Sequence, residues 1–282
     1  MGIFLTFLDV LIHPIVYSYN CSFIFFSLET FFGAPKIVKT LLLSSYSGMH
    51  ACTMSFVAIQ FIYRYFILIN SSKISWFEKK KLYLWIFYSL SIWILWVTVA
   101  SLTLMNDKYA IEYYRNKIFA IYRSNIDEIS SYIVVAYEID SMTNEKKVKI
   151  PHLLCMIILS SILASQYFII VFCTIRMKLK MKEKLELFST SQRRLQKQLY
   201  KVLVFQLITP SLIIHLPFLP LFIIPFLNIQ IDIETSFLIA GVSSYPFIDT
   251  LFLLLMVSEY RYGFRNLFRC TGVTETRSSH LA

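Results

Sequence analysis

The residues of this sequence that could do chemistry are the few polar side chains inside long apolar stretches: Asp9, His13, His50, Gln166, Gln206, His215 and Asp249. Histidines and carboxylates can transfer protons or bind metals, and amides can hold polar groups of a ligand. The sequence has no HExxH motif, no glycine-rich phosphate loop, and no Ser or Cys nucleophile with a suitable base. We therefore predict that the protein is not an enzyme and uses no cofactor and no metal. For each of these residues a packing contact is the default interpretation, and a ligand contact is the alternative.

The overall composition indicates the environment that surrounds these residues. Of the 282 residues, 57% are hydrophobic, 17% are aromatic and 16% are charged, whereas soluble domains are about 45–50% apolar and about 25% charged. The mean hydropathy is +0.61, and the five cysteines show no close pairing. This composition excludes a soluble enzyme, a disordered chain, a fibrous repeat and a disulfide framework. It predicts a membrane protein.

Long uncharged stretches predict a bundle of transmembrane helices. The hydrocarbon core of a bilayer is about 30 Å thick and requires roughly 20 apolar residues per helix. Six stretches qualify, and the first is the weakest because it carries Asp9 and is interrupted by His13-Pro14. We expect an all-α transmembrane domain over residues 1–260 and a cytoplasmic tail over residues 261–282. The expected spans are approximately 3–28, 40–63, 82–106, 150–175, 202–227 and 235–258.

Lysine and arginine residues orient the predicted bundle. Residues 63–81, 176–201 and 259–282 hold 18 of the 27 basic residues, and short cytoplasmic loops are the ones that accumulate Lys and Arg. The tail and the N-terminus are therefore expected in the cytoplasm, and Asn20, in an Asn-Cys-Ser sequon, is a glycosylation candidate outside. Attraction to anionic lipid explains the net charge of +10. The lipid bilayer is thus a predicted partner, and nucleic acid is not.

The second predicted span ends in Tyr63, Arg64 and Tyr65. An arginine at the foot of a long apolar helix can simply extend to the lipid headgroups. It can also be a switch residue that packs between aromatic rings and is released when the helices separate. Both interpretations stay open, and we single out these three residues as switch candidates.

The fifth predicted span is rich in proline and follows a basic segment. Pro210 and Pro217 each remove a backbone hydrogen bond and predict a hinge, whereas Pro220 and Pro225 lie nearer the end of the span. The preceding segment predicts a helix that extends into the cytoplasm, with leucines at 195, 199 and 203 on one face. Its basic side chains are candidates for contacting a cytoplasmic partner: Arg193, Arg194, Lys197 and Lys201.

The last predicted span contains Pro246 and Asp249. A buried acid next to a kink usually faces the bundle or water and not lipid, so this pair is either a second hinge or a structural hydrogen-bonding site. After the span, Arg261 and Arg265 alternate with apolar residues at helical spacing, which predicts a short amphipathic helix on the inner leaflet. Cys270 beside it is a palmitoylation candidate.

Four stretches together resemble one family. The sequence is similar to the nematode seven-transmembrane chemoreceptors, the serpentine receptors of class r (Str-type), which are related to the class j group. The order and spacing of the motifs fit over essentially the whole chain. The matching stretches are FLDVLIHPIVYSY at 7–19, FIYRY at 61–65, LQKQLYKVLVFQ at 195–206, and PFID at 246–249 followed by Tyr260-Arg261.

The resemblance implies a rhodopsin-like GPCR architecture, with two departures. In the family the stretch that ends in His13-Pro14 belongs to the second helix, so we expect six of the seven helices here, without the first. The family motif continues Asp-Pro, whereas Thr250 follows Asp249 here, which removes one kink. The resemblance also implies a receptor for an odorant or pheromone, coupled to a heterotrimeric G protein, in the plasma membrane of a sensory cilium.

The hypothesis that follows has two conformational states. A small molecule would bind near Gln166 and Tyr167, the proline-containing span would swing outward, and the freed Arg64 and the basic segments would meet the G protein. One alternative is a six-span transporter or channel subunit, which lacks support from a sequence repeat, a filter-like loop or an arginine-rich sensor helix. Another is a truncated receptor copy that does not signal.

Overall fold

The computed structural model describes residues 2–29, 33–69, 71–105, 107–139, 144–186 and 189–256. The helical elements are α1 (Gly2–Ile12), α2 (Lys36–Ile69), η2 (Ser71–Phe77), η3 (Lys79–Lys81), α3 (Leu82–Leu104), α4 (Lys108–Tyr122), α5 (Ile150–Leu185), α6 (Thr190–Pro210), η4 (Ser211–His215), α7 (Leu216–Ile223), η5 (Ile224–Leu227) and α8 (Phe237–Met256). The strands are β1 (Pro14–Asn20), β2 (Ser22–Ser27), β3 (Ser130–Val135), β4 (Tyr137–Ile139), β5 (Lys146–Val148) and β6 (Ile231–Glu234).

Long apolar helices make up most of the structure. Within the described ranges, five helical segments are long and apolar enough to cross a membrane: Lys36–Ile69, Lys79–Leu104, Ile150–Met181, Thr190–Leu227 and Phe237–Met256. Helix α2 lies at the centre and packs against α3 and α5, while α6 packs against α8. The prediction of a mostly helical membrane bundle is confirmed.

The first predicted span, residues 3–28, is wrong as a single helix. Helix α1 ends at Ile12, His13 adopts a left-handed conformation with φ of 42°, and the chain continues as the antiparallel hairpin of β1 and β2. Proline disfavours the helical conformation of the residue before it, so Pro14 ends the helix. The following residues are rich in Val, Ile, Tyr and Phe, which favour strands.

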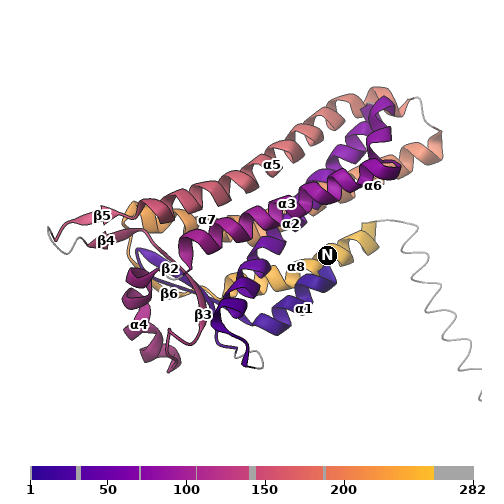
Figure 1. Cartoon of the computed structure of the whole chain (residues 1–282). Helices are drawn as coiled ribbons and strands as arrows, with labels where there is room; N and C mark the ends of the chain where they lie inside the picture. The colour runs from indigo at the N-terminus through magenta and orange to yellow at the C-terminus, as the bar shows by residue number, and fades with distance from the viewer. Residues whose placement is uncertain are drawn as a thin grey trace, which may run out of the picture.

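A four-stranded antiparallel sheet lies at one end of the helical bundle and was not expected from the sequence. Its strand order is β3-β2-β1-β6, and Figure 1 shows it clustered with α4 at the end opposite the turn between α5 and α6. We call this the sheet end. The strands come from chain segments 14–27, 130–135 and 231–234. The charge pattern places the second of these, most of the third and the end of the first on one side of the membrane, whereas most of residues 14–27 were expected inside the first span. The opposite end, with residues 64–69, 71–81, 176–186 and 189–201, is called the basic end.

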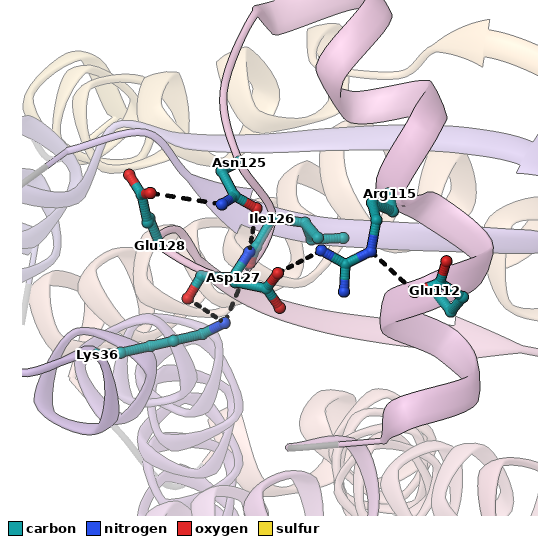
Figure 2. Close-up of polar contacts among 7 residues, drawn as sticks. All are labelled: Lys36, Glu112, Arg115, Asn125, Ile126, Asp127 and Glu128. Carbon is teal, nitrogen blue, oxygen red and sulfur yellow. Dashed lines mark hydrogen bonds and ion pairs between the residues drawn. The ribbon is translucent and has the colours of Figure 1, made fainter.

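Helix α4 packs on the sheet and is tied to the bundle by polar contacts shown in Figure 2. Arg115 of α4 donates to Glu112 at 2.8 Å and also pairs with Asp127 in the following loop. Lys36, at the start of α2, donates to the backbone carbonyls of Ile126 and Asp127 at 3.0 Å each. These contacts fix the loop between α4 and β3 to the first turn of α2.

A more buried charge cluster joins α4, β4 and α5. Asp107 caps α4 by accepting from the backbone N–H groups of Tyr109 and Ala110, and its carboxylate lies 2.5 Å from Lys149 Nζ and 2.8 Å from His152 Nε2. Burial raises the pKa of Asp107, but hydrogen bonds from His152 and Lys149 and the lysine charge outweigh this effect, so its pKa lies well below the ordinary value. The cluster therefore holds an ionised carboxylate at the base of the sheet end.

Candidate functional site

A cavity of about 310 Å³ lies between the sheet and the helix bundle. Binding cavities for small molecules begin at about 300 Å³ and are mostly apolar, with a few polar groups that orient the occupant. Strands β1, β2 and β3 form its roof, and α2, α3, α5, η4, α7 and α8 form its walls and floor. The roof and wall residues include Val16, Phe23, Phe25, Trp96, Ala100, Tyr132, Val134, Met156, Leu159, Phe218, Phe222, Ile239 and Val242.

The floor of the cavity carries a polar cluster. His50 of α2 and His215 of η4 are half-buried and line the cavity together with Tyr167 of α5. The two Nε2 atoms of the histidines lie 3.3 Å apart, and the Tyr167 hydroxyl lies 2.8 Å from both His215 Nδ1 and Ser211 Oγ. Side chains from three helical elements thus meet at one point below the cavity.

The polar cluster adjoins an irregularity in the proline-rich segment. After Pro210 the helix changes to a π-helical turn over Ser211–His215 before α7 continues, as expected where a proline removes a backbone hydrogen bond. The Leu216 N–H donates to the Ser211 carbonyl, and His215 Nδ1 lies 3.1 Å from the Pro210 carbonyl. The structure therefore places Pro210 at a helix irregularity directly under the cavity.

Pro217 affects the contact between this segment and α8. A proline at 217 cannot donate to the carbonyl of Ile213, four residues earlier. That carbonyl oxygen points at Gly241 of α8, where an added Cβ atom would lie 2.8 Å from it. Glycine at 241 is therefore required for the close approach of the two helices.

Gln166 and Tyr167, the two residues predicted to lie near a ligand, face different surroundings in the structure. Tyr167 lines the cavity, whereas Gln166, its neighbour on α5, is fully buried outside the lining. Consecutive residues on an α-helix point about 100° apart, so they face different neighbours. Neither side-chain polar atom of Gln166 has a hydrogen-bond partner among the described residues. Tyr167 therefore lines the cavity and Gln166 does not, and a ligand contact at either residue stays a prediction.

Pro246 and Asp249 both lie on α8, and Asp249 links this helix to α6. Asp249 accepts a hydrogen bond of 3.4 Å from Gln206, and its other carboxylate oxygen is buried without a partner among the described residues. Pro246 contacts the start of α1, where a Cβ atom on Gly2 would lie 3.1 Å from the proline ring. Both residues lie on the inside of the bundle, as their types suggest.

The switch candidates lie at the basic end. The guanidinium of Arg64 lies 5.8 Å from the centre of the Tyr63 ring, a cation–π arrangement. The Tyr63 ring in turn contacts Phe77 at 5.0 Å between ring centres, and Tyr65 contacts Phe172 of α5 at 6.2 Å. Arg64 is half-buried, so it is held beside aromatic rings, and its role as a switch stays a prediction.

The predicted basic helix forms the first half of α6. It begins with a capping box in which Ser189 and Gln192 exchange hydrogen bonds. Arg194, Lys197 and Lys201 are exposed and Arg193 is half-buried, while Leu203 on the opposite face is buried. The predicted tail residues Arg261, Arg265 and Cys270 lie outside the described residues.

The glycosylation candidate lies at the sheet end. Asn20 occupies the turn between β1 and β2 with φ of 49°, a left-handed conformation that asparagine tolerates. Its side-chain amide donates to the Tyr113 hydroxyl at 3.2 Å. Whether this half-buried side chain carries a glycan stays a prediction.

Sequence reasoning missed the pairing of His50 with His215. The two residues are 165 positions apart, and each appears alone on an apolar helix, where a packing contact is the default interpretation. The available signal was that both residues are histidines and lie at similar depths in the predicted spans 40–63 and 202–227, the second of which contains the predicted proline hinge. Only the packing of α2 against η4 shows that they meet.

Comparison with known proteins identifies the family of this chain. Residues 1–265 match the family model described as serpentine type 7TM GPCR chemoreceptor Str. G-protein coupled receptor str-33 of Caenorhabditis elegans is 35% identical over 269 residues, which cover 95% of this chain and 78% of that receptor. Serpentine receptor class r-10 of C. briggsae and that of C. elegans are each 24% identical, and each match covers 99% of this chain and 82% of the receptor. The chain belongs to the Str family of serpentine seven-transmembrane chemoreceptors, which are multi-pass membrane proteins and not enzymes.

Proposed function

We propose that this chain is a chemosensory receptor that binds a small odorant or pheromone in the cavity and signals to a heterotrimeric G protein at the basic end. The observation that carries the proposal is the position of the cavity floor. His215 is both a floor residue and the last residue of the π-helical turn next to Pro210. An occupant of the cavity would therefore touch the hinge directly.

The proposed signal passes along α6 and α8. The segment containing Pro210 and Pro217 swings outward at the basic end, and Pro246 and Asp249 of α8 provide the second hinge against which it moves. A ligand shifts this equilibrium only by binding one state more tightly than the other. The two states differ at the π-helical turn, because π-turns inside helices mark local irregularity and often occur at functional sites.

The proposed G-protein contact lies at the basic end. Outward movement of α6 separates it from α2 and uncovers the basic end of α2, where Arg64 lies beside Tyr63. The α subunit then contacts the exposed basic side chains of α6, which are Arg194, Lys197 and Lys201. Arg193, Arg261 and Arg265 are further contacts in this proposal. A cytoplasmic basic end and the plasma membrane of a sensory cilium are parts of the same proposal.

An arginine substitution tests the switch. In cells that express the receptor and a G-protein α subunit, Arg64→Ala should leave surface expression intact and abolish calcium signals evoked by small volatile molecules. Lys73→Ala removes an exposed positive charge from η2 at the same end and should signal normally. Normal signalling from Arg64→Ala would refute the switch role. A ligand-gated current in cells without the G protein would favour a channel over a receptor.

A further inference from the structure

The hydrogen bonds below the cavity determine which ring nitrogen of His215 carries the proton. The Ser211 hydroxyl donates to the Leu207 carbonyl at 2.6 Å, so the Tyr167 hydroxyl, 2.8 Å from Ser211, donates to the serine oxygen. The Tyr167 proton is then used, and its oxygen accepts from His215 Nδ1, 2.8 Å away. The Pro210 carbonyl, which only accepts, lies 3.1 Å from the same nitrogen. His215 therefore carries its proton on Nδ1, and its Nε2 is an acceptor.

This assignment fixes the protonation of His50. Because His215 Nε2 has no proton, His50 Nε2 must donate across the 3.3 Å that separates the two atoms. That distance is longer than the usual 2.9–3.0 Å of an N–H donor to an oxygen acceptor. His50 Nδ1 has no partner among the described residues. The contact between the two histidines is therefore a weak one between a defined donor and a defined acceptor.

The polar atoms of three aromatic side chains on the cavity wall already have partners. The Tyr46 hydroxyl donates to Asp9 at 2.8 Å, and Trp96 Nε1 donates to Ser47 at 3.0 Å. The Tyr132 hydroxyl lies 3.1 Å from Ser101 Oγ. An occupant would have to break a satisfied hydrogen bond to use any of these groups, whereas the histidine pair offers a donor and an acceptor that are weakly joined.

We propose, on the basis of the receptor function above, that the cavity binds a small uncharged alcohol or phenol whose hydroxyl inserts between His50 Nε2 and His215 Nε2. A hydroxyl both accepts and donates, so it accepts from His50 and donates to His215. A ketone or aldehyde accepts from His50 and leaves His215 Nε2 without a donor. A hydrocarbon offers neither group, and a carboxylate brings a charge into apolar surroundings.

The size and opening of the cavity suit such a molecule. A volume of about 310 Å³ holds roughly ten non-hydrogen atoms if each takes the ~30 Å³ that a water molecule occupies in the liquid. Ser160 of α5 and Leu219 of α7 both line the cavity and are exposed on the surface of the bundle. The cavity therefore reaches the apolar surface between α5 and α7, which favours an occupant that dissolves in the bilayer.

Insertion of a hydroxyl would also move the hinge. When one oxygen makes two hydrogen bonds of about 2.8 Å, the two nitrogen atoms that it joins lie about 4.6 Å apart. The Nε2 atoms of the two histidines lie 3.3 Å apart in the structure. His50 lies on the long central helix α2, whereas His215 ends the π-helical turn. The displacement is therefore expected at His215, and it strains the contacts of His215 with Tyr167 and Pro210.

The test compares four ligands that share an unbranched chain of similar length: 1-octanol, 2-octanone, nonane and octanoate. Binding is measured to the purified full chain in lipid nanodiscs without G protein. We expect 1-octanol to bind about tenfold more tightly than 2-octanone or nonane, because it alone satisfies both histidines. In His50→Phe this preference should disappear while nonane still binds. In His50→Gln, whose amide can donate, part of the preference should return. The matched control, His13→Asn, alters an exposed histidine outside the cavity.

The outcomes separate the ligand class from the proposed function. The inference is overturned if another ligand binds more tightly than 1-octanol, if the alcohol preference survives in His50→Phe, or if none of the four binds. Should His50→Phe also lose nonane binding, the His50→Gln variant decides, since a complete loss of the alcohol preference there contradicts the donor role. Nucleotide exchange on an added G protein is measured separately. Alcohol binding without stimulated exchange contradicts the signalling function and leaves the ligand class standing.

Discussion

Replacement of Asp107 by asparagine tests how the sheet end is held over the cavity. The Asp107 side chain is 14% exposed, Lys149 is 11% exposed and His152 is 1% exposed. Asparagine is as good an N-cap as aspartate, so Asp107→Asn keeps the cap of α4. It removes the charge and replaces the oxygen that faces Lys149 and His152 by an amide NH2 group, which cannot accept a hydrogen bond. The substitution leaves the lysine with Glu138, 3.4 Å away and 46% exposed, as its remaining acidic neighbour among the described residues.

The expected loss of stability is large for a substitution that changes so few atoms. Removal of one partner of a buried ion pair costs about 3–5 kcal/mol, because the other charge stays buried. The partly exposed Glu138 offsets some of this cost. We therefore expect Asp107→Asn to lower the free energy of unfolding by about 3 kcal/mol at neutral pH.

The effect should depend on pH in a defined direction. The pKa of Asp107 is lower in the folded protein than its ordinary value of 3.8, so the folded state binds this proton less readily than the unfolded state. The stabilising contribution is therefore present above about pH 4. It is lost as the pH falls from there through the folded pKa. The stability difference between wild type and Asp107→Asn should be constant near neutral pH and shrink under strong acid.

Thermal and denaturant unfolding in detergent measures this difference, and a double-mutant cycle with Lys149→Met isolates the pair. Glu112→Gln makes the same chemical change in a surface pair whose acid is 71% exposed, and it should cost no more than about 1 kcal/mol. A loss for Asp107→Asn as small as that of Glu112→Gln, or strictly additive effects in the cycle, would show that the cluster does not hold the sheet end.

Two further predictions concern the cavity and its hinge. Gly241→Ala places a Cβ atom 2.8 Å from the Ile213 carbonyl, which costs about 1–3 kcal/mol as overpacking against about 1 kcal/mol gained in helix propensity. A lower melting temperature is expected, and an unchanged or higher one would contradict the close approach; Ala240→Ser is the exposed control. Ser160→Trp covers the opening between α5 and α7, so stopped-flow binding should show slower association and dissociation of 1-octanol. An unchanged association rate would exclude this route.

Five of the spans follow from composition, but the first one does not. Five spans could be predicted because long apolar runs satisfy the length rule for membrane helices. Residues 14–27 are equally apolar, and a hydropathy count cannot separate a helix from a strand that is buried on both faces. Strand β2 is such a strand, since most of its residues are buried. The decisive local signal was His13-Pro14, which marks an end of the helix.

The candidate site was predictable only in parts. Tyr167, Pro210 and Pro217 could be identified because their helix and their residue types carry local information. The pairing of His50 with His215 depends on tertiary contact between distant helices, and no spacing rule relates them. The same holds for Gly241, whose role appears only when α8 is placed against the Ile213 carbonyl.

The central claim is that occupancy of the cavity controls a G protein at the opposite end of the bundle. The most direct measurement is nucleotide exchange on a purified heterotrimer, with the receptor in nanodiscs and 1-octanol as the added ligand. Ala100→Phe adds a ring to a residue of the cavity wall and should block the ligand. We predict that 1-octanol accelerates exchange with the wild-type chain and not with Ala100→Phe. Equal acceleration by both proteins would contradict the account.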